Sequence, residues 1–353
     1  MSNVIAFDPQ PQVSAGCALT RLIATFAQDR RAPDDVFWLK ENAEVLNILE
    51  ATDARPDPDA LNPHAEFYAG LEERLHFYPQ YYRFLLSICL DLEDLGMPGD
   101  IGARLCRWAA DQGLAQAELS DLQRAEARRL LARRGAALAL ANDPLAARLR
   151  GFIGRSTTFA MPNKKAAYEL THIVFYLAEY GRRDPQLDRA ALTSLEYAGL
   201  LAYLDQNLDL LAEVCTALHF AGQRPSPIWL EAVARCHAGM AVVGDPAAPL
   251  QDAYHTYLET GWTRAVVGTP AFQAVPDEGG LRFRPARGTM GALLPLSECL
   301  FDLGPERSTD WEKMRGQVMP YLGADGHEVL YKAERSTDKF DVFFEGFARA
   351  AAR

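Results

Sequence analysis

The residues of this chain best suited to chemistry lie in YELTHIVFYLAEYG, residues 168–181, a segment that is apolar on nearly every side. His172 and Glu179 are seven positions apart, so in a helix they project from the same side, about 10 Å apart along the axis. A helix that is apolar nearly all round is buried, and a buried ionised carboxylate costs several kcal/mol unless it is partnered. The spacing therefore predicts that His172, Glu179 and the neighbouring Tyr176 face a polar cavity, a ligand or a partner.

An ordinary structural explanation of the same residues stays open. His172 can be a hydrogen-bonded core histidine, and Glu179, near the helix end, can pair with Arg182 or Arg183. Glu169 then only favours the amino terminus of the helix, where the helix dipole stabilises negative charge. What lies opposite His172 distinguishes the two explanations.

The next helical region supplies candidate partners. Within AYLDQNLDLLAEVCTALHFAG, Asp205, Asp209 and Glu213 recur every four residues and would share one face of a single helix. That face can simply be solvated. If it instead faces His172 across a helix hairpin, His172, Asp209 and Glu213 can bind a divalent metal, or can act as an acid and a base of different pKa. The Glu-x-x-His pairing of bundle metal sites occurs only once here, at Glu169 and His172, so a complete di-iron signature is absent.

A motif in this region resembles a known pattern. Thr171-His172-x-x-Phe175-Tyr176, ending in Glu179-Tyr180-Gly181 and followed about thirty residues later by D-L-L-A-E, is similar to a pattern in uncharacterised bacterial all-helical proteins, some associated with natural-product gene clusters. The resemblance covers roughly residues 165–222. It implies no reaction, but it implies that six side chains lie together: Thr171, His172, Tyr176, Glu179, Asp209 and Glu213.

Cys236 and His237 form a second candidate metal site. Their adjacent Cys-His step is similar to the zinc-binding step of lanthionine cyclases, which are α/α toroids. Those enzymes add an upstream Trp-Cys-x-Gly cysteine and a later His-Gly step, and neither occurs here. Cys215 is the available third ligand, but no CxxC spacing organises the set. A packed cysteine beside a surface histidine is the alternative.

Composition limits the classes of function. The chain has 353 residues, 49% of them hydrophobic, which is enough for a large core. Its net charge of −11 argues against nucleic-acid binding, which needs a basic face. No leader or long apolar window is recognisable, and six scattered cysteines suggest no disulfide framework, so we expect a cytoplasmic protein that does not bind membranes. One basic run is typical of a solvated helix face: Arg124, Arg128, Arg129, Arg133 and Arg134.

Helical periodicity nearly everywhere predicts an all-α fold. We expect a disordered tail over residues 1–16 and a single large helical domain over 17–353, with a soft division near 152–163. One helical region is expected over 187–221, and a Gly- and Pro-rich loop over 261–289 with a short ribbon at LRFRP. The helices can form an α/α toroid or an irregular stack of antiparallel helix pairs. No repeat period is present, which favours the toroid over a regular solenoid array.

Two functional hypotheses follow. The first is a cavity-based enzyme, with a place in a biosynthetic pathway, that acts on a small metabolite or peptide. Its chemistry would be metal-assisted, with a divalent metal, or general acid-base, and would use His172, Tyr176, Glu179, Asp209 and Glu213. The alternative is a non-catalytic helical scaffold that docks a protein partner and uses the same groups as a buried structural network.

Overall fold

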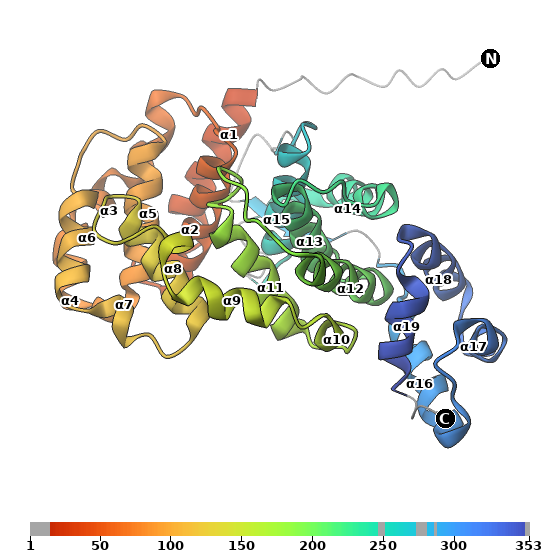
Figure 1. Cartoon of the computed structure of the whole chain (residues 1–353). Coiled ribbons are helices and arrows are strands. Elements are labelled where there is room, and N and C mark those ends of the chain that lie inside the picture. The colour runs from red at the N-terminus through yellow and green to blue at the C-terminus, as the bar shows by residue number, and fades with distance from the viewer. Residues whose placement is uncertain (1–14, 246–250, 273–280, 286–287, 350–353) are drawn as a thin grey trace, which may run out of the picture.

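The computed structural model describes residues 15–245, 251–272, 281–285 and 288–349 (Figure 1). The α-helices in these residues are α1 (Ala15–Ala24), α2 (Val36–Ala51), α3 (Ala65–Ala69), α4 (Leu71–Phe77), α5 (Tyr82–Asp94), α6 (Gly102–Asp111), α7 (Leu114–Ala117), α8 (Asp121–Ala132), α9 (Leu145–Ile153), α10 (Ser156–Phe159), α11 (Lys164–Leu177), α12 (Arg189–Asp205), α13 (Leu208–Phe220), α14 (Pro227–Gly239), α15 (Tyr254–Val266), α16 (Leu293–Leu303), α17 (Trp311–Val318), α18 (Ala324–Ser336) and α19 (Phe340–Ala348). The prediction of an all-α fold is confirmed.

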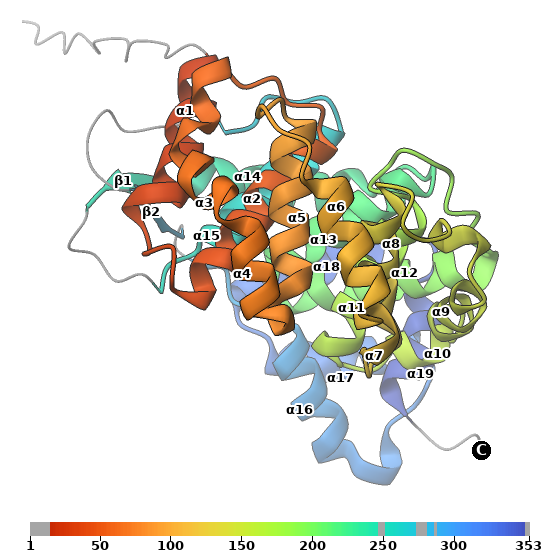
Figure 2. The same cartoon turned by 90° about the vertical axis from the view of Figure 1, so that its left-hand side faces the viewer.

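Short turns of 3₁₀- or π-helix and one small ribbon complete the described structure. The turns are η1 (Thr25–Asp29), η2 (Pro58–His64), η3 (Pro79–Tyr81), η4 (Leu140–Asn142), η5 (Gly304–Glu306) and η6 (Met319–Tyr321). Strand β1 (Ala241–Gly244) pairs antiparallel with β2 (Leu281–Arg284), and Figure 2 shows this ribbon at the edge of the molecule, beside the N-terminal helices. The ribbon expected at LRFRP is therefore present.

Six helices follow one another in a closed order of contacts. Helix α2 contacts α5, α5 contacts α8, α8 contacts α11, α11 contacts α13, α13 contacts α15, and α15 contacts α2 again. Along the chain these six are separated by other helices: α3 and α4, α6 and α7, α9 and α10, α12, and α14. The last four helices, α16 to α19, lie to one side (blue in Figure 1) and reach the rest through α12 and α14.

The carboxyl ends of three of these helices, α2, α5 and α8, meet in an ionic cluster. Arg133, the residue that caps the end of α8, lies 2.7 Å from both Asp91 and Asp94 in the last turn of α5, and 3.6 Å from Glu50 near the end of α2. Arg129, one turn earlier, is only 2% exposed. The arginine run is thus not the solvated face that we expected. Arg133, whose side chain is 10% exposed, joins the ends of α2, α5 and α8.

Two sequence-based boundaries were wrong. The region 187–221 is not one helix, because α12 ends at Asp205 and Gln206 adopts a left-handed backbone with φ of 54°. Asp205 therefore lies on a different helix from Asp209 and Glu213, and it pairs with Lys164 at 2.8 Å.

The predicted loop over 261–289 begins too early. Residues 261–266 are the last turns of α15, and Gly261 is needed there because an added Cβ would lie 2.3 Å from the Phe272 ring. Residues 273–280 and 286–287 of the predicted loop, and residues 1–14 of the predicted tail, lie outside the described residues. Ala15 and Gly16, which we placed in the tail, already belong to α1.

Two expectations from composition can be compared with the structure. All six cysteines are free thiols, and most are buried. None of the helices in the described part of the chain is long and apolar enough to cross a membrane.

The core contains a neutral, fully buried histidine. His64 Nε2 lies 2.7 Å from Asn42 Oδ1, while the Asn42 amide donates to the carbonyls of Phe26 and Trp38. Because the Asn42 amide nitrogen is used as a donor, its oxygen accepts a hydrogen bond from the protonated Nε2 of neutral His64. Burial lowers the pKa of His64 to about 4.

We predict that acid weakens the fold partly through His64. The unfolded chain binds a proton on this histidine near pH 6.5 and the folded protein only near pH 4. Stability from neutral His64 is therefore complete above about pH 6.5 and is lost as the pH falls towards 4, by at most roughly 3 kcal/mol. Urea unfolding followed by circular dichroism at pH 7 and 4.5 should show a smaller loss for His64→Gln than for wild type. Replacement of the exposed His76 by Gln is the control, and an equal loss in His64→Gln and wild type contradicts the prediction.

Candidate metal centre

His172 lies opposite Glu213. Helix α11 begins where the Asn163 side chain accepts a hydrogen bond from the Ala166 amide, and it buries most of its surface. His172 Nε2 lies 3.6 Å from Glu213 Oε2 on α13, with the Glu213 side chain only 2% exposed. The sequence predicted this cross-helix approach. The catalytic and metal-binding roles assigned to the two residues stay predictions.

Helix α11 also fixes the carboxylates of α13. The Thr171 hydroxyl donates to Glu213 Oε2, and the Tyr168 hydroxyl donates to Asp209 Oδ2 at 2.8 Å. Burial tends to lower the pKa of His172, but the nearby Glu213 carboxylate outweighs this and raises it. The His172 side chain nevertheless remains 41% exposed.

A cluster that the sequence did not reveal lies on two further helices. Glu44 of α2 and His255 and Glu259 of α15 each offer one ligand atom, and these three atoms lie within 4.8 Å of one another. Among the described residues this is the group of histidine and acidic side chains that can hold a metal ion. His255 and Glu259 are four positions apart, so they share one face of α15. The H-x-x-x-E spacing in YHTYLET was the only sequence signal.

Three buried atoms of this cluster lack hydrogen-bond partners among the described residues. They are Glu44 Oε1, His255 Nδ1 and Glu259 Oε2. The closest charged contact between them, from His255 Nδ1 to Glu44 Oε1, is 3.8 Å, which is longer than a hydrogen bond. Most buried polar side-chain atoms in proteins do have a partner, so the cluster is suited to binding a cation that bridges these atoms.

The electrostatics of the cluster favour such a cation. Burial raises the pKa of Glu44, and His255 only partly offsets this. Burial raises the pKa of Glu259 still more, and repulsion from Glu213, Glu44 and Asp209 adds to the effect. Several carboxylates therefore share one poorly solvated region, where a divalent cation would stabilise their ionised forms.

The acids lie at one depth in the molecule. Glu44 in α2, Glu213 in α13 and Glu259 in α15 each precede the last residue of their helix by seven positions, or about 10 Å. Because α11 contacts α13, α13 contacts α15 and α15 contacts α2, these side chains follow one another around the inside of the four helices. His172 in α11 precedes the end of its helix by five positions.

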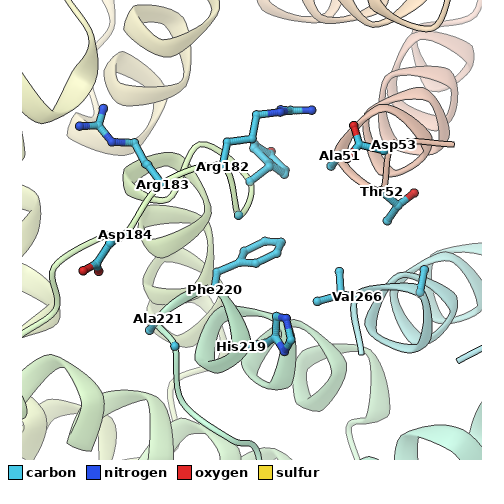
Figure 3. A pocket seen from close by; sticks show the side chains of 14 residues that line it. Ala51, Thr52, Asp53, Arg182, Arg183, Asp184, His219, Phe220, Ala221 and Val266 are labelled. Carbon is cyan, nitrogen blue, oxygen red and sulfur yellow. The ribbon is translucent and has the colours of Figure 1, made fainter. Parts of the chain in front are cut away.

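A cleft of about 760 Å³ opens at the carboxyl ends of these helices. Its walls come from residues 51–53 at the end of α2, 180–184 after α11, 219–222 at the end of α13, and 265–266 of α15. In Figure 3, His219 and Phe220 occupy the middle of this space, with Thr52 and Asp53 on one side and Val266 close by. All four helices thus end at this cleft and run in the same direction.

Aromatic rings lie between the cleft and His172. The Trp262 ring is 4.8 Å from Phe175, 5.8 Å from Tyr180 and 5.9 Å from Phe220, between centroids. Phe175 is in turn 5.9 Å from the His172 ring. Tyr180 and Phe220 of this aromatic group line the cleft, and Trp262 and Phe175 lie behind them.

Tyr176 lies where the sequence placed it, but Glu179 does not. The Tyr176 ring is 6.1 Å from His172, and burial raises its pKa. Glu179 lies beyond the end of α11, with φ of 47°, and its carboxylate is 3.3 Å from Arg129 of α8. The prediction that Glu179 faces Asp209 or Glu213 is therefore wrong. The helix ends too early to carry it inward, and its partner is not one of the expected arginines, Arg182 and Arg183.

Cys236 and His237 do not assemble a metal site. His237 Nδ1 lies 3.0 Å from the Thr260 hydroxyl, and its ring stacks on Tyr257 at 4.8 Å between centroids. Burial lowers the pKa of His237 to about 4. Within the described chain, Cys215 does not join Cys236 and His237 in a three-ligand group. His237 is a partly buried, hydrogen-bonded histidine that stacks on a core tyrosine.

Comparison with protein families places the whole molecule in one of them. Residues 1–350 match the family described as Domain of unknown function (DUF6902). The chain belongs to this DUF6902 family. The match agrees with the expected kinship to uncharacterised proteins, while the Thr-His-x-x-Phe-Tyr motif itself stays a prediction. No curated protein and no solved structure matches the chain.

We predict that Thr171 supports the DUF6902 fold through Glu213. Replacing Thr171 by Val keeps the shape but removes the hydroxyl that donates to a buried carboxylate, so the free energy of unfolding should fall by about 1–3 kcal/mol. Thr193→Val is the control, because that exposed hydroxyl bonds only the Arg189 carbonyl within its own helix. Urea unfolding at neutral pH measures both. A Thr171→Val protein as stable as the control would show that Glu213 does not depend on this donor.

Proposed function

We propose that this DUF6902 chain is an enzyme that binds a divalent transition-metal ion inside an α/α toroid and uses it on a small metabolite or peptide. The observation that carries the proposal is the set of three buried, unpartnered atoms on Glu44, His255 and Glu259. Two carboxylates and one imidazole suit Mn²⁺, Fe²⁺ or Zn²⁺. Three protein ligands leave coordination positions open, as in catalytic rather than structural sites.

The arrangement of the helices supports the toroid. The six helices α2, α5, α8, α11, α13 and α15 contact one another in a closed order, and other helices separate them along the chain. Their carboxyl ends lie on one side, as the cleft and the Arg133 cluster indicate. Parallel inner helices that alternate with outer helices characterise an α/α toroid. An irregular stack of antiparallel pairs requires neither closure nor a shared direction.

The metal would supply a Lewis acid and lower the pKa of bound water. The protein's own groups orient and enclose the site. Thr171 and Tyr168 hold the carboxylates of Glu213 and Asp209 by hydrogen bonds. The aromatic layer around Trp262 limits the entry of water from the cleft, which strengthens electrostatic interactions inside. A small substrate would enter through the cleft.

The scaffold alternative explains less. A purely structural polar network is stable when its members satisfy one another, as Thr171 and Glu213 do. In the cluster of Glu44, His255 and Glu259, three atoms are instead buried without partners. A scaffold would gain stability if apolar residues replaced them. We therefore favour the enzyme, and a place in a biosynthetic pathway remains part of the hypothesis.

We predict that protein purified without a polyhistidine tag contains near-stoichiometric divalent transition metal. Elemental analysis by inductively coupled plasma mass spectrometry measures it. His255→Ala and Glu44→Gln each remove one ligand and should weaken metal binding at least about tenfold. Added Mn²⁺ should raise the melting temperature of wild type but not of His255→Ala.

The matched control for these variants is His219→Ala, because His219 is exposed and lines the cleft rather than the cluster. It should retain the metal. Wild-type protein that binds neither Mn²⁺ nor Zn²⁺, or a His255→Ala variant that binds as well as wild type, contradicts the proposal and returns the chain to the scaffold alternative.

A further inference from the structure

A small pocket lies at the opposite end of α2 from the cleft. It has a volume of about 230 Å³, and its walls come from residues between 33 and 39 where α2 begins, Phe67 of α3, Arg74 of α4, Tyr78 and Tyr81 around η3, and Leu85 of α5. Figure 2 shows α3, α4 and α5 on the face of the molecule turned towards the viewer. None of the three proposed metal ligands lines this pocket, so it is a separate site.

The interior of the pocket is apolar. Leu39, Phe67 and Leu85 are buried, and the rings of Tyr78 and Tyr81 approach each other to 6.4 Å between centroids. Such a lining favours the burial of an apolar side chain. The volume is below the roughly 300–1,000 Å³ of sites for drug-sized ligands and equals that of about eight water molecules. The space therefore suits one molecule of the size of leucine or phenylalanine rather than a peptide of several residues.

Two opposite charges also line the pocket without being paired. The Arg74 guanidinium lies over the Phe67 ring, 5.0 Å from its centroid, but has no acidic partner within the described chain. Asp34 has no basic partner there either, and the two residues do not pair with each other. Asp34 is exposed and Arg74 is half-buried, so both charges lie nearer to solvent than the apolar interior.

The helices hold these two charges on different elements. Arg74 belongs to α4, while Asp34 directly precedes Asp35, whose side chain accepts the capping hydrogen bond at the start of α2. Opposite charges around one small space attract each other, yet this arrangement keeps them apart. A ligand that carries a negative and a positive group would satisfy both.

We propose that this pocket binds a free amino acid with an apolar side chain. Arg74 binds the carboxylate, because a guanidinium group pairs with a carboxylate through two parallel hydrogen bonds. Asp34 binds the ammonium group, and the apolar interior takes up the side chain. A ligand with only one of these charges leaves Arg74 or Asp34 without a partner. The inference goes beyond the proposed metal chemistry and does not depend on it.

Isothermal titration calorimetry of the full-length wild-type protein with L-phenylalanine and L-leucine tests the proposal. We expect at least one of them to bind with a dissociation constant of about 1 mM or lower, because two charge-assisted contacts add to the burial of an apolar side chain. Hydrocinnamate and isocaproate, which lack the ammonium group, should bind at least about tenfold more weakly. Phenethylamine and isoamylamine, which lack the carboxylate, should be weakened to a similar extent.

Variants locate the site. Arg74→Gln and Asp34→Asn each remove one charge and should weaken binding of the amino acid at least about tenfold. Arg104→Gln is the matched control, because Arg104 pairs with Glu72 of α4 at 2.8 Å and does not line the pocket. It should bind as wild type does.

Three results would overturn the proposal: neither amino acid bound at this affinity, an analogue without one charge bound as tightly as its parent, or undiminished binding in Arg74→Gln or Asp34→Asn. Because the analogues are tested on wild-type protein, the decision does not depend on whether a variant folds.

Discussion

The cost of keeping ionised carboxylates away from water governs the interior of this protein. Glu44, Glu213 and Glu259 lie in the middle of the helices that surround them, and burial raises the pKa of Glu44 and Glu259. The hydrogen bond that Thr171 donates to the Glu213 carboxylate offsets part of this cost. Glu44 Oε1 and Glu259 Oε2 have no hydrogen-bond partner among the described residues. A bound cation is the simplest physical answer, because it satisfies the ligand atoms and cancels the repulsion between them.

This arrangement is possible because the carboxyl ends of the helices lie close to one another. Ion pairs of Arg133 hold the ends of α2, α5 and α8, and the ends of α2, α11, α13 and α15 surround the cleft. Glu44, Glu213 and Glu259 each lie seven residues before the end of their helix, so these three residues lie at the same depth. The aromatic rings packed around Trp262 separate that level from the cleft. Burial at that level raises the pKa of Glu44 and of Glu259.

Local patterns in the sequence predicted the helices and one half of the site. Helical periodicity is a property of neighbouring residues. His172 and Glu213 come from α11 and α13, which only α12 separates along the chain, so their approach could be expected. Glu44 and His255 could not be found in this way, because their contact depends on α2 meeting α15 across the whole chain. The errors at Gln206 and Glu179 have a different cause. Both residues adopt positive φ without being glycine, so the glycine that commonly marks a helix end is absent at these two positions.

The position of a bound ion tests the account most directly. Crystals grown with Mn²⁺ should be measured by X-ray diffraction on both sides of the manganese absorption edge, so that anomalous scattering locates the metal without reference to the protein. The account predicts a strong peak within about 2.3 Å of the side-chain ligand atoms of Glu44, His255 and Glu259. A crystal whose anomalous peaks all lie on the molecular surface, with these three side chains in direct contact with one another or with water alone, would contradict it.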